Sequence, residues 1–349
     1  MGCTGDSGMS KDNYITAIIQ VQDFEEEDDI QLINSYDAIV RYTPDEAREG
    51  EDLDDEAEIK DVSISIDGAP DIPFTYKYNF KQRGKYRVKY TFHHPLKKTD
   101  YMFCYCINLI QIDLTHFNSE QVTNMSNMFF NLKNTEIIDV SKLNTKNVTD
   151  MGNMFFNCEK VKKLDVSRFD TGNVENMYNM FAGCRNLEEL DLSRFNTKKL
   201  VVMSYLLCDC IKLKKVDVSN FNTENVMRMC GVFLHCEELK EINVKSFNTK
   251  NVFEIDEMFG ATTLVESYDL SSFNTEKIES MTSLFRECKN LKKVNLSSFK
   301  VSPDTRLEKM FFHCPNLEKK NIITKDEKIK AQYDLDLVAK DEDEEAEEA

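Results

Sequence analysis

The chain has 349 residues, eleven cysteines and a formal net charge of −18. This length accommodates one long repeat domain and a small partner domain. The sequence has no basic stripe that could displace counterions from phosphates, which argues against nucleic acid as the main partner, and no apolar stretch approaches the roughly 20 residues of a membrane span.

Residues 1–13 form a leader that carries a candidate acylation site. Gly2 would become the amino terminus after removal of Met1, and Cys3 beside it could take a palmitoyl chain. Two acyl chains anchor a protein stably where one does not. The usual myristoylation pattern is incomplete, because Asp6 stands where Ser or Thr is expected. Two interpretations stay open: an N-terminus acylated with myristate on Gly2 and palmitate on Cys3, and a flexible leader without acyl chains.

Residues 14–100 have the pattern of a small antiparallel β domain. β-branched and aromatic residues alternate with polar ones, which is typical of half-buried strands. Asp67-Gly68 and Arg83-Gly84 are turn signals between these segments. The expected strands are Tyr14–Val21, Ile30–Ile33, Val62–Ile66, Phe74–Phe80 and Tyr86–Phe92. The last strand leads directly into the next domain, so we expect this β domain to act as its N-terminal cap.

A 26-residue repeat runs through residues 101–320 without insertions across eight units. Such self-similarity indicates small units that bury their apolar faces by stacking on one another. The recurring phenylalanines are Phe117, Phe169, Phe195, Phe221, Phe247, Phe273 and Phe299, with Leu143 in the one gap. The recurring cysteines are Cys106, Cys158, Cys184, Cys210, Cys236, Cys288 and Cys314, with Leu132 and Thr262 in the two gaps.

Each unit can be divided into short elements. The alternation over Leu190–Ser193 predicts a short strand with one buried face, and Asn196-Thr197 predicts a turn. Asn173–Met177 fits either a second short strand or an extended arc. Because Met177, Met180 and Phe181 are spaced by three and four, we expect a single helical turn there.

The phrase Leu190–Thr197, followed in other units by Asn-Val-x-x-Met-x-x-Met-Phe-x-x-Cys, resembles the BspA-like leucine-rich repeat family over residues 101–320. This resemblance implies a repeat solenoid, leucine-rich-repeat-like, with short parallel strands, single helical turns and about eight 26-residue coils. It also implies a role in binding other macromolecules, and it carries no catalytic residues. Departures such as Leu143 and Thr262 suggest that the coils are not all alike.

Residues 321–340 are expected to form a C-terminal cap, and the acidic residues 341–349 a disordered tail.

Cofactor and enzyme chemistry find little support in the sequence. The cysteines are mostly repeat-spaced instead of standing two to four residues apart as in metal sites, so we interpret them as buried core residues. The acidic runs Glu25–Asp29 and 45–61 lack the spacing of calcium loops and fit solvated loops. His235 and His313 precede repeat cysteines without an orienting third group. We therefore expect no enzyme, no cofactor and no metal.

A column of acidic residues marks the candidate partner face. Its members include Asp165, Asp191 and Asp217, and like charges stacked on neighbouring strands repel one another. Either each Asp bonds nearby backbone and serine groups, which we favour, or a cation or basic partner lies on that face. Exposed residues beside the column vary and are better candidates for specificity. The candidate partner face comprises Asp165, Arg168, Asp191, Arg194, Asp217 and Asn220.

These features together predict a non-enzymatic protein–protein interaction scaffold or adaptor that binds partners along one face of the coils. The alternatives are a structural subunit of a larger intracellular assembly and a cell-surface adhesin, as in bacterial relatives of the family that the repeats resemble. Because no secretion signal is evident, we expect a cytoplasmic location, with a tether to the inner face of a membrane if Gly2 and Cys3 are acylated.

Overall fold

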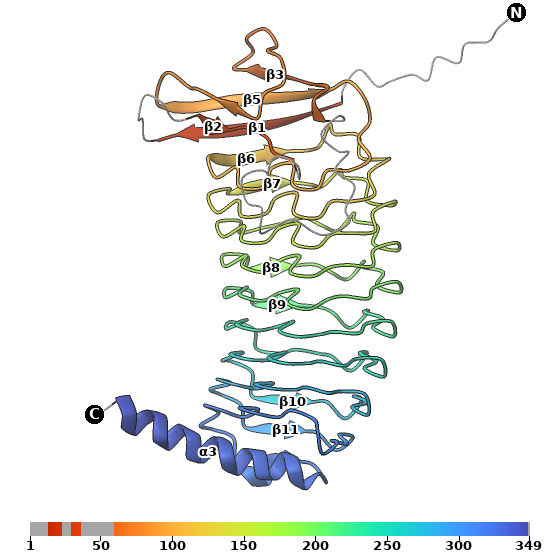
Figure 1. Ribbon diagram of the computed structural model, residues 1–349, viewed down its shortest axis with the longest axis vertical. Coiled ribbons are helices and arrows are strands. Elements are labelled where there is room, and N and C mark those ends of the chain that lie inside the picture. The colour runs from red at the N-terminus through yellow and green to blue at the C-terminus, as the bar shows by residue number, and fades with distance from the viewer. Residues whose placement is uncertain (1–12, 23–28, 36–58, 348–349) are drawn as a thin grey trace, which may run out of the picture.

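The structure is a computed structural model that describes residues 13–22, 29–35 and 59–347. Figure 1 shows a column of stacked coils with a β-sheet at its N-terminal end and a long helix at its C-terminal end. In chain order the elements are β1 Tyr14–Val21, β2 Ile30–Gln31, β3 Val62–Ile66, β4 Lys77–Tyr78, β5 Gly84–Phe92, β6 Leu109–Asp113, β7 Ile137–Asp139, β8 Glu189–Leu190, β9 Lys215–Val216, β10 Ser267–Asp269, β11 Lys293–Asn295, η2 Lys319–Asn321, β12 Ile322–Ile323 and α3 Glu327–Glu347.

The N-terminal sheet is continuous with the coils. Its strand order is β3-β5-β1-β6-β7, and β1 pairs antiparallel with both β5 and β6. The chain runs from β5 directly into the first coil, as expected, whereas the strand that pairs with the first coil is β1. β5 lies on the far side of β1, and Thr16 of β1 aligns with Asp113 of the first coil. The segment expected as a strand over Phe74–Phe80 is reduced to β4, which pairs only with β2.

Two parallel ladders run along the column. The first, which we call the strand face, contains β6 to β11 and the bridge between Lys163 and Glu189. The second ladder lies in the segment that we read as either a strand or an extended arc, and it is unbroken. Its bridges join, in order, Lys98, Asn124, Asp150, Asn176, Val202, Arg228, Glu254, Ser280 and Arg306.

The helical turn expected at Met177–Phe181 is wrong. The main-chain N–H groups of Met177, Asn179 and Phe181 donate to carbonyls of the next coil at 2.9 to 3.1 Å, so they cannot form the i→i−4 bonds of a helix. Asn179 and Gly183 have positive φ, at 53° and 75°. Between residues 101 and 318 the structure has turns and short strands but no helix.

The repeat phenylalanines and cysteines lie in the core. The phenylalanines from Phe117 to Phe299 are at most 5% exposed. A second phenylalanine column stacks beside them, as in the pair Phe129–Phe155, whose ring centroids are 5.4 Å apart. The remaining members of this second column are Phe103, Phe181, Phe233, Phe259, Phe285 and Phe311, with Leu207 in the gap. Stacked rings and buried apolar area are the main stabilising contributions that each coil gains from its neighbours.

The threonine of the Asn-Thr pair joins successive coils. The Thr223 hydroxyl donates to the Asn248 carbonyl at 3.0 Å and accepts the Asn248 N–H at 2.7 Å. The asparagine closes the turn, since the Asn222 carboxamide accepts the N–H of Glu224 two residues later. The sequence therefore repeats this pair because one side chain bonds within the coil and the other bonds between coils.

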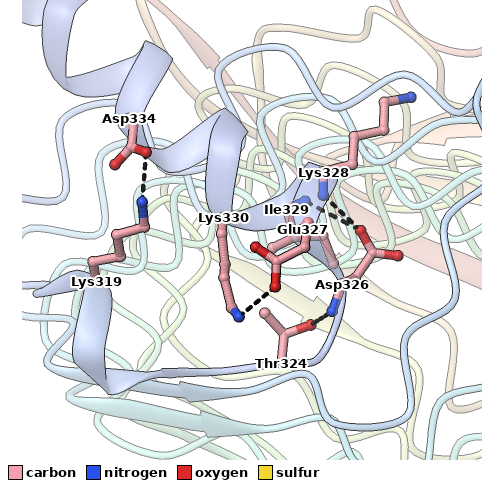
Figure 2. Close-up of polar contacts among 8 residues, drawn as sticks. All are labelled: Lys319, Thr324, Asp326, Glu327, Lys328, Ile329, Lys330 and Asp334. Atoms are coloured by element: carbon pink, nitrogen blue, oxygen red, sulfur yellow. Dashed lines mark hydrogen bonds and ion pairs between the residues drawn. The ribbon is translucent and has the colours of Figure 1, made fainter.

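The C-terminal end is closed by η2, β12 and α3. Asp326 caps the helix, because its carboxylate accepts the N–H groups of Lys328 and Ile329 at 3.0 and 3.3 Å (Figure 2). Ile329 and Tyr333 are buried against the last coil. The helix continues to Glu347, so residues 341–347, which we expected to be disordered, are helical, as a segment rich in Glu favours.

Candidate partner-binding face

The three aspartates of the candidate partner face share one environment on the strand face. Each is exposed and lies at or directly after a short strand or bridge of that face. The Ser167 hydroxyl and N–H both donate to Oδ1 of Asp165, at 2.6 and 3.0 Å. The N–H groups of Ser193 and Ser219 bond Asp191 and Asp217 at 2.9 Å.

These hydrogen bonds explain how the stacked carboxylates coexist. Bonds from Ser167 lower the pKa of Asp165 below its usual value, and the Arg168 charge contributes further. The pKa values of Asp191 and Asp217 are lowered in the same way, by Ser193 and Ser219. Each aspartate is thus held as a carboxylate by its own turn, as in the local alternative that we favoured. The column needs no bound cation to remain charged.

The other three residues of the candidate partner face lie in the turn after the strand. Arg168 and Arg194 are exposed and make no ion pair with another described residue. Asn220 is engaged by the preceding coil, because its amide donates to the carbonyls of Ser193 and Phe195 at 3.1 and 2.9 Å. The arginines are therefore available to a partner, whereas Asn220 has a structural role.

A second charged column on this face was missed by sequence reasoning. Lys163, Glu189 and Lys215 line a surface groove together with the three aspartates, and Leu164, Leu190 and Val216 lie between the two columns. Residues two apart on a strand share a face, so the alternation would have revealed this column. Unlike the aspartates, its charge changes sign from coil to coil. The groove therefore presents a surface on which positive and negative side chains alternate, instead of a surface of one charge.

The strand face is interrupted at two places among the described residues, between β7 and the coil of Lys163 and between β9 and β10; the second is the one beside an exposed apolar side chain. No bridge joins residues 241–243 to either neighbouring coil among the described residues, and the N–H groups of Glu241, Ile242 and Asn243 donate to no described acceptor. A wider concavity lies there, lined by Lys240, Lys245, Leu264, Glu266 and Asp269 among others. Leu264 is exposed. Meanwhile Val202, Arg228 and Glu254 on the second ladder remain bridged, so the coils are held together on one side and separated on the other.

A third concavity closes the N-terminal end of the same face. It is lined by Thr16, Arg87, Gln111 and Asp139 among others, so the N-terminal β domain contributes directly to the strand face. Hollows therefore occur on the strand face beside β6 and β7, along β8 and β9, and between β9 and β10.

Neither a metal site nor a disulfide emerges from the residues that the structure describes. Nine of the ten described cysteines are buried and the tenth, Cys208, is half-buried; all are free thiols. No group of three metal-ligating side chains occurs in the described ranges. The candidate acylation residues Gly2 and Cys3 lie outside them, as do the acidic run Glu25–Asp28 and residues 45–58. No helix in the described part of the chain is both long and apolar enough to cross a bilayer.

The comparisons with known proteins match the coil region. A family model described as "Mycoplasma protein of unknown function, DUF285" matches residues 97–216 and again residues 202–325. The chain belongs to the DUF285 family. The two DUF285 matches together cover residues 97–325, so strands β1 to β5 and the helix α3 lie outside the matched segment, whereas β6 and β7 of the N-terminal sheet lie inside it. No curated protein and no solved structure matched this DUF285 chain.

Proposed function

We propose that this DUF285 chain is a non-enzymatic protein–protein interaction scaffold whose strand face binds the partner. In this proposal the coils form a leucine-rich-repeat-like solenoid, although with turns in place of helices. Extended surfaces of stacked repeats are suited to long macromolecular ligands, since each coil adds a few side chains to one continuous face.

The interruption at Glu241–Asn243 carries the proposal. Unpaired main-chain groups beside an exposed apolar side chain, Leu264, are a combination that a partner can cover and bond. The charged groove along Lys163, Glu189 and Lys215 continues the same face. Its alternating charges would select a partner of complementary pattern and favour correct encounters over incorrect ones.

Charge reversal on the strand face tests this function. The variant Lys163→Glu/Lys215→Glu/Lys240→Glu changes three exposed lysines whose ammonium groups bond no described residue. Tagged chains are purified from the source cell and the co-purifying proteins are quantified by mass spectrometry. We expect recovery of the specific partner to fall by about tenfold or more, in line with the loss of several central charges from an interface. Arg168→Glu/Arg194→Glu should weaken recovery less, because both arginines lie in the turns after the strands and line none of these hollows.

The matched control is Lys146→Glu/Lys198→Glu/Lys250→Glu. These lysines are equally exposed and change the net charge by the same amount, but they follow the Asn-Thr turns and line none of the three hollows. The control should recover the partner at the wild-type level. Equal recovery by all three variants would remove the strand face from consideration.

Location and tethering stay predictions of the sequence. Fatty-acid labelling of the wild-type chain and of Gly2→Ala and Cys3→Ser variants decides whether the scaffold is held at a membrane. Salt-resistant co-purification of a fixed set of subunits would instead favour a structural part of a larger assembly.

A further inference from the structure

A hollow of about 180 Å³ lies in the turns that follow the second ladder, and we call it the Gly260 hollow. It shares no lining residue with the hollows of the strand face. Gly260 and Ala261 line it from one coil, and the residues at the same repeat positions in the two neighbouring coils are larger. These are Leu234 and His235 in the coil before, and Arg286 and Glu287 in the coil after. Two small residues between larger ones therefore leave the space open.

A small residue at this repeat position does not by itself leave a hollow. Gly183 stands three coils before Ala261, and a Cβ added to Gly183 would lie 2.1 Å from Oδ1 of Asn157. The asparagine side chain therefore covers that turn. At Gly260 the nearest atom to an added Cβ is Cδ1 of Leu234, at 2.8 Å, and the space beside Ala261 remains. The Gly260 hollow is thus a feature of one coil and not of the repeat.

Three polar side chains that line the Gly260 hollow bond no other described residue. Ser283 is only 5% exposed, yet its hydroxyl has no hydrogen-bond partner in the described part of the chain. The carboxylate of Glu257 and the imidazole of His235 are half-buried and have none there either. Buried polar groups are normally paired, because leaving one unpaired costs free energy. The hollow is therefore suited to a ligand that can form hydrogen bonds.

The charges of the Gly260 hollow favour a cation. Nη2 of Arg286 lies 3.0 Å from Oε1 of Glu287, so these two charges offset each other. Glu257 has no counter-ion among the described residues, which leaves one net negative charge. No group of three metal-ligating side chains occurs in the described ranges, so the cation is not a coordinated metal ion. Leu234 supplies an apolar wall.

We propose that the Gly260 hollow binds a small alkylammonium ion. The ammonium group donates to the carboxylate of Glu257 and to the hydroxyl oxygen of Ser283, and the hydrocarbon part packs against Leu234. The volume equals that of about six water molecules at ~30 Å³ each, which limits the ligand to a few carbon atoms. So small a ligand binds weakly, with a dissociation constant of about 1 mM. This site does not depend on the function proposed for the strand face.

Ligand-observed saturation-transfer NMR on the purified full chain tests the site. The probe is n-butylammonium, and butyrate is the control of similar size and opposite charge. We expect saturable binding of butylammonium near about 1 mM and none of butyrate. A lysine blocked at both main-chain ends carries the same ammonium chain: equal affinity assigns the ligand to a lysine of a protein, and an affinity at least several-fold lower assigns it to a free amine.

Two variants locate the binding in the Gly260 hollow. Ala261→Asn fills the space without changing the net charge, and the backbone accepts it, because Asn131 and Asn157 hold the same position with φ of 62° and 55° against 52° for Ala261. Glu257→Gln removes the unpaired charge. Each should weaken butylammonium binding at least about fivefold, the equivalent of losing one ion pair. Unchanged circular dichroism and thermal unfolding should show that both variants fold.

Glu175→Gln is the matched control. It removes one exposed carboxylate that lines no part of the hollow, so it changes the net charge as Glu257→Gln does and should bind butylammonium like the wild type. No saturable binding up to about 20 mM, or equal binding by Ala261→Asn and the wild type, overturns the proposal. Displacement of butylammonium by micromolar Ca²⁺ or Zn²⁺ would assign the hollow to a metal ion and overturns it as well.

Discussion

The N–H of Phe311 donates to Oδ2 of Asp336 at 2.8 Å, across the boundary between the last coil and α3. The equivalent N–H groups of Phe259 and Phe285 donate to main-chain carbonyls 25 residues later, at Leu284 and Met310. Asp336 also follows Phe311 by 25 residues. A side-chain carboxylate thus occupies the place of the missing carbonyl and pairs the buried N–H of Phe311 at the end of the column.

Removal of this carboxylate should loosen the last coil. Asp336→Ala leaves the buried Phe311 N–H without an acceptor, which costs about 1–3 kcal/mol. Asp336→Asn keeps an oxygen in the same place and should cost less. Hydrogen exchange at Phe311, followed by mass spectrometry, is expected to quicken strongly in the alanine variant and modestly in the asparagine variant. Equal exchange in wild type and Asp336→Ala would show that the cap bond is not stabilising.

The hydroxyl of the repeated threonine should stabilise the folded chain by bonding successive coils to one another. Thr223→Val keeps the shape but removes the bonds to the Asn248 N–H and carbonyl, so we expect a loss of about 1–3 kcal/mol in unfolding free energy by urea denaturation. Thr223→Ser is the matched control, because Ser119 occupies the same column and makes both bonds, to Asn144. Serine should therefore cost clearly less than valine. The reverse order would mean that the methyl group matters more than the hydroxyl.

A side chain at position 231 should be excluded by the ring of Tyr205. The φ of Gly231 is 56°, and a Cβ added there would lie 2.3 Å from Cδ1 of Tyr205. The equivalent residues Asn179 and Glu257 have similar φ without being glycine, so the ring contact is the main constraint. Gly231→Ala should cost about 1–3 kcal/mol in thermal unfolding, and Tyr205→Ala in the same chain should restore part of that loss. If the double variant is as unstable as the sum of the two single ones, the ring contact is not the cause.

The buried thiols should make stability depend on alkaline pH. Burial raises the pKa of Cys184 from 9.0 to about 12, and its Sγ–H donates to the Phe155 carbonyl at 3.3 Å. Between these two values the folded chain keeps a proton that the unfolded chain loses, so stability should fall as pH rises above about 9. Iodoacetamide at about pH 9 should alkylate Cys184 slowly in the folded chain and rapidly in urea. Rapid labelling of the folded chain, read by mass spectrometry, would contradict this burial.

The 26-residue spacing predicts the buried columns well, because residues one repeat apart occupy equivalent places in successive coils. The interpretation of the repeat cysteines as core residues is confirmed by their burial, and β1, β3 and most of β5 lie where the alternation places strands. The turn at Met177–Phe181 could not be predicted in this way. Its spacing of three and four fits a helix, but its N–H groups bond the next coil, and no pattern within one unit reveals a partner in another.

Only part of the candidate site could be predicted, because the sequence of one unit shows which residues are exposed but not how neighbouring coils pair. Asp165 and Arg168 were identified because they stand in exposed columns, and both are exposed in the structure. The interruption at Glu241–Asn243 was not foreseen, since Ile242 and Val244 continue the apolar alternation of the other units. Whether neighbouring strands pair depends on how the coils above and below stack, which is a property of the whole column.

Photocrosslinking from the two ladders tests the central claim most directly. A photoreactive phenylalanine analogue replaces Glu189 on the strand face in one chain and Arg228 on the second ladder in another; both positions are exposed and both lie in parallel bridges. After irradiation in the source cell, the position 189 chain should form a discrete cross-linked product with its partner, and the position 228 chain should form little or none. A product from position 228 with none from position 189 would contradict the account.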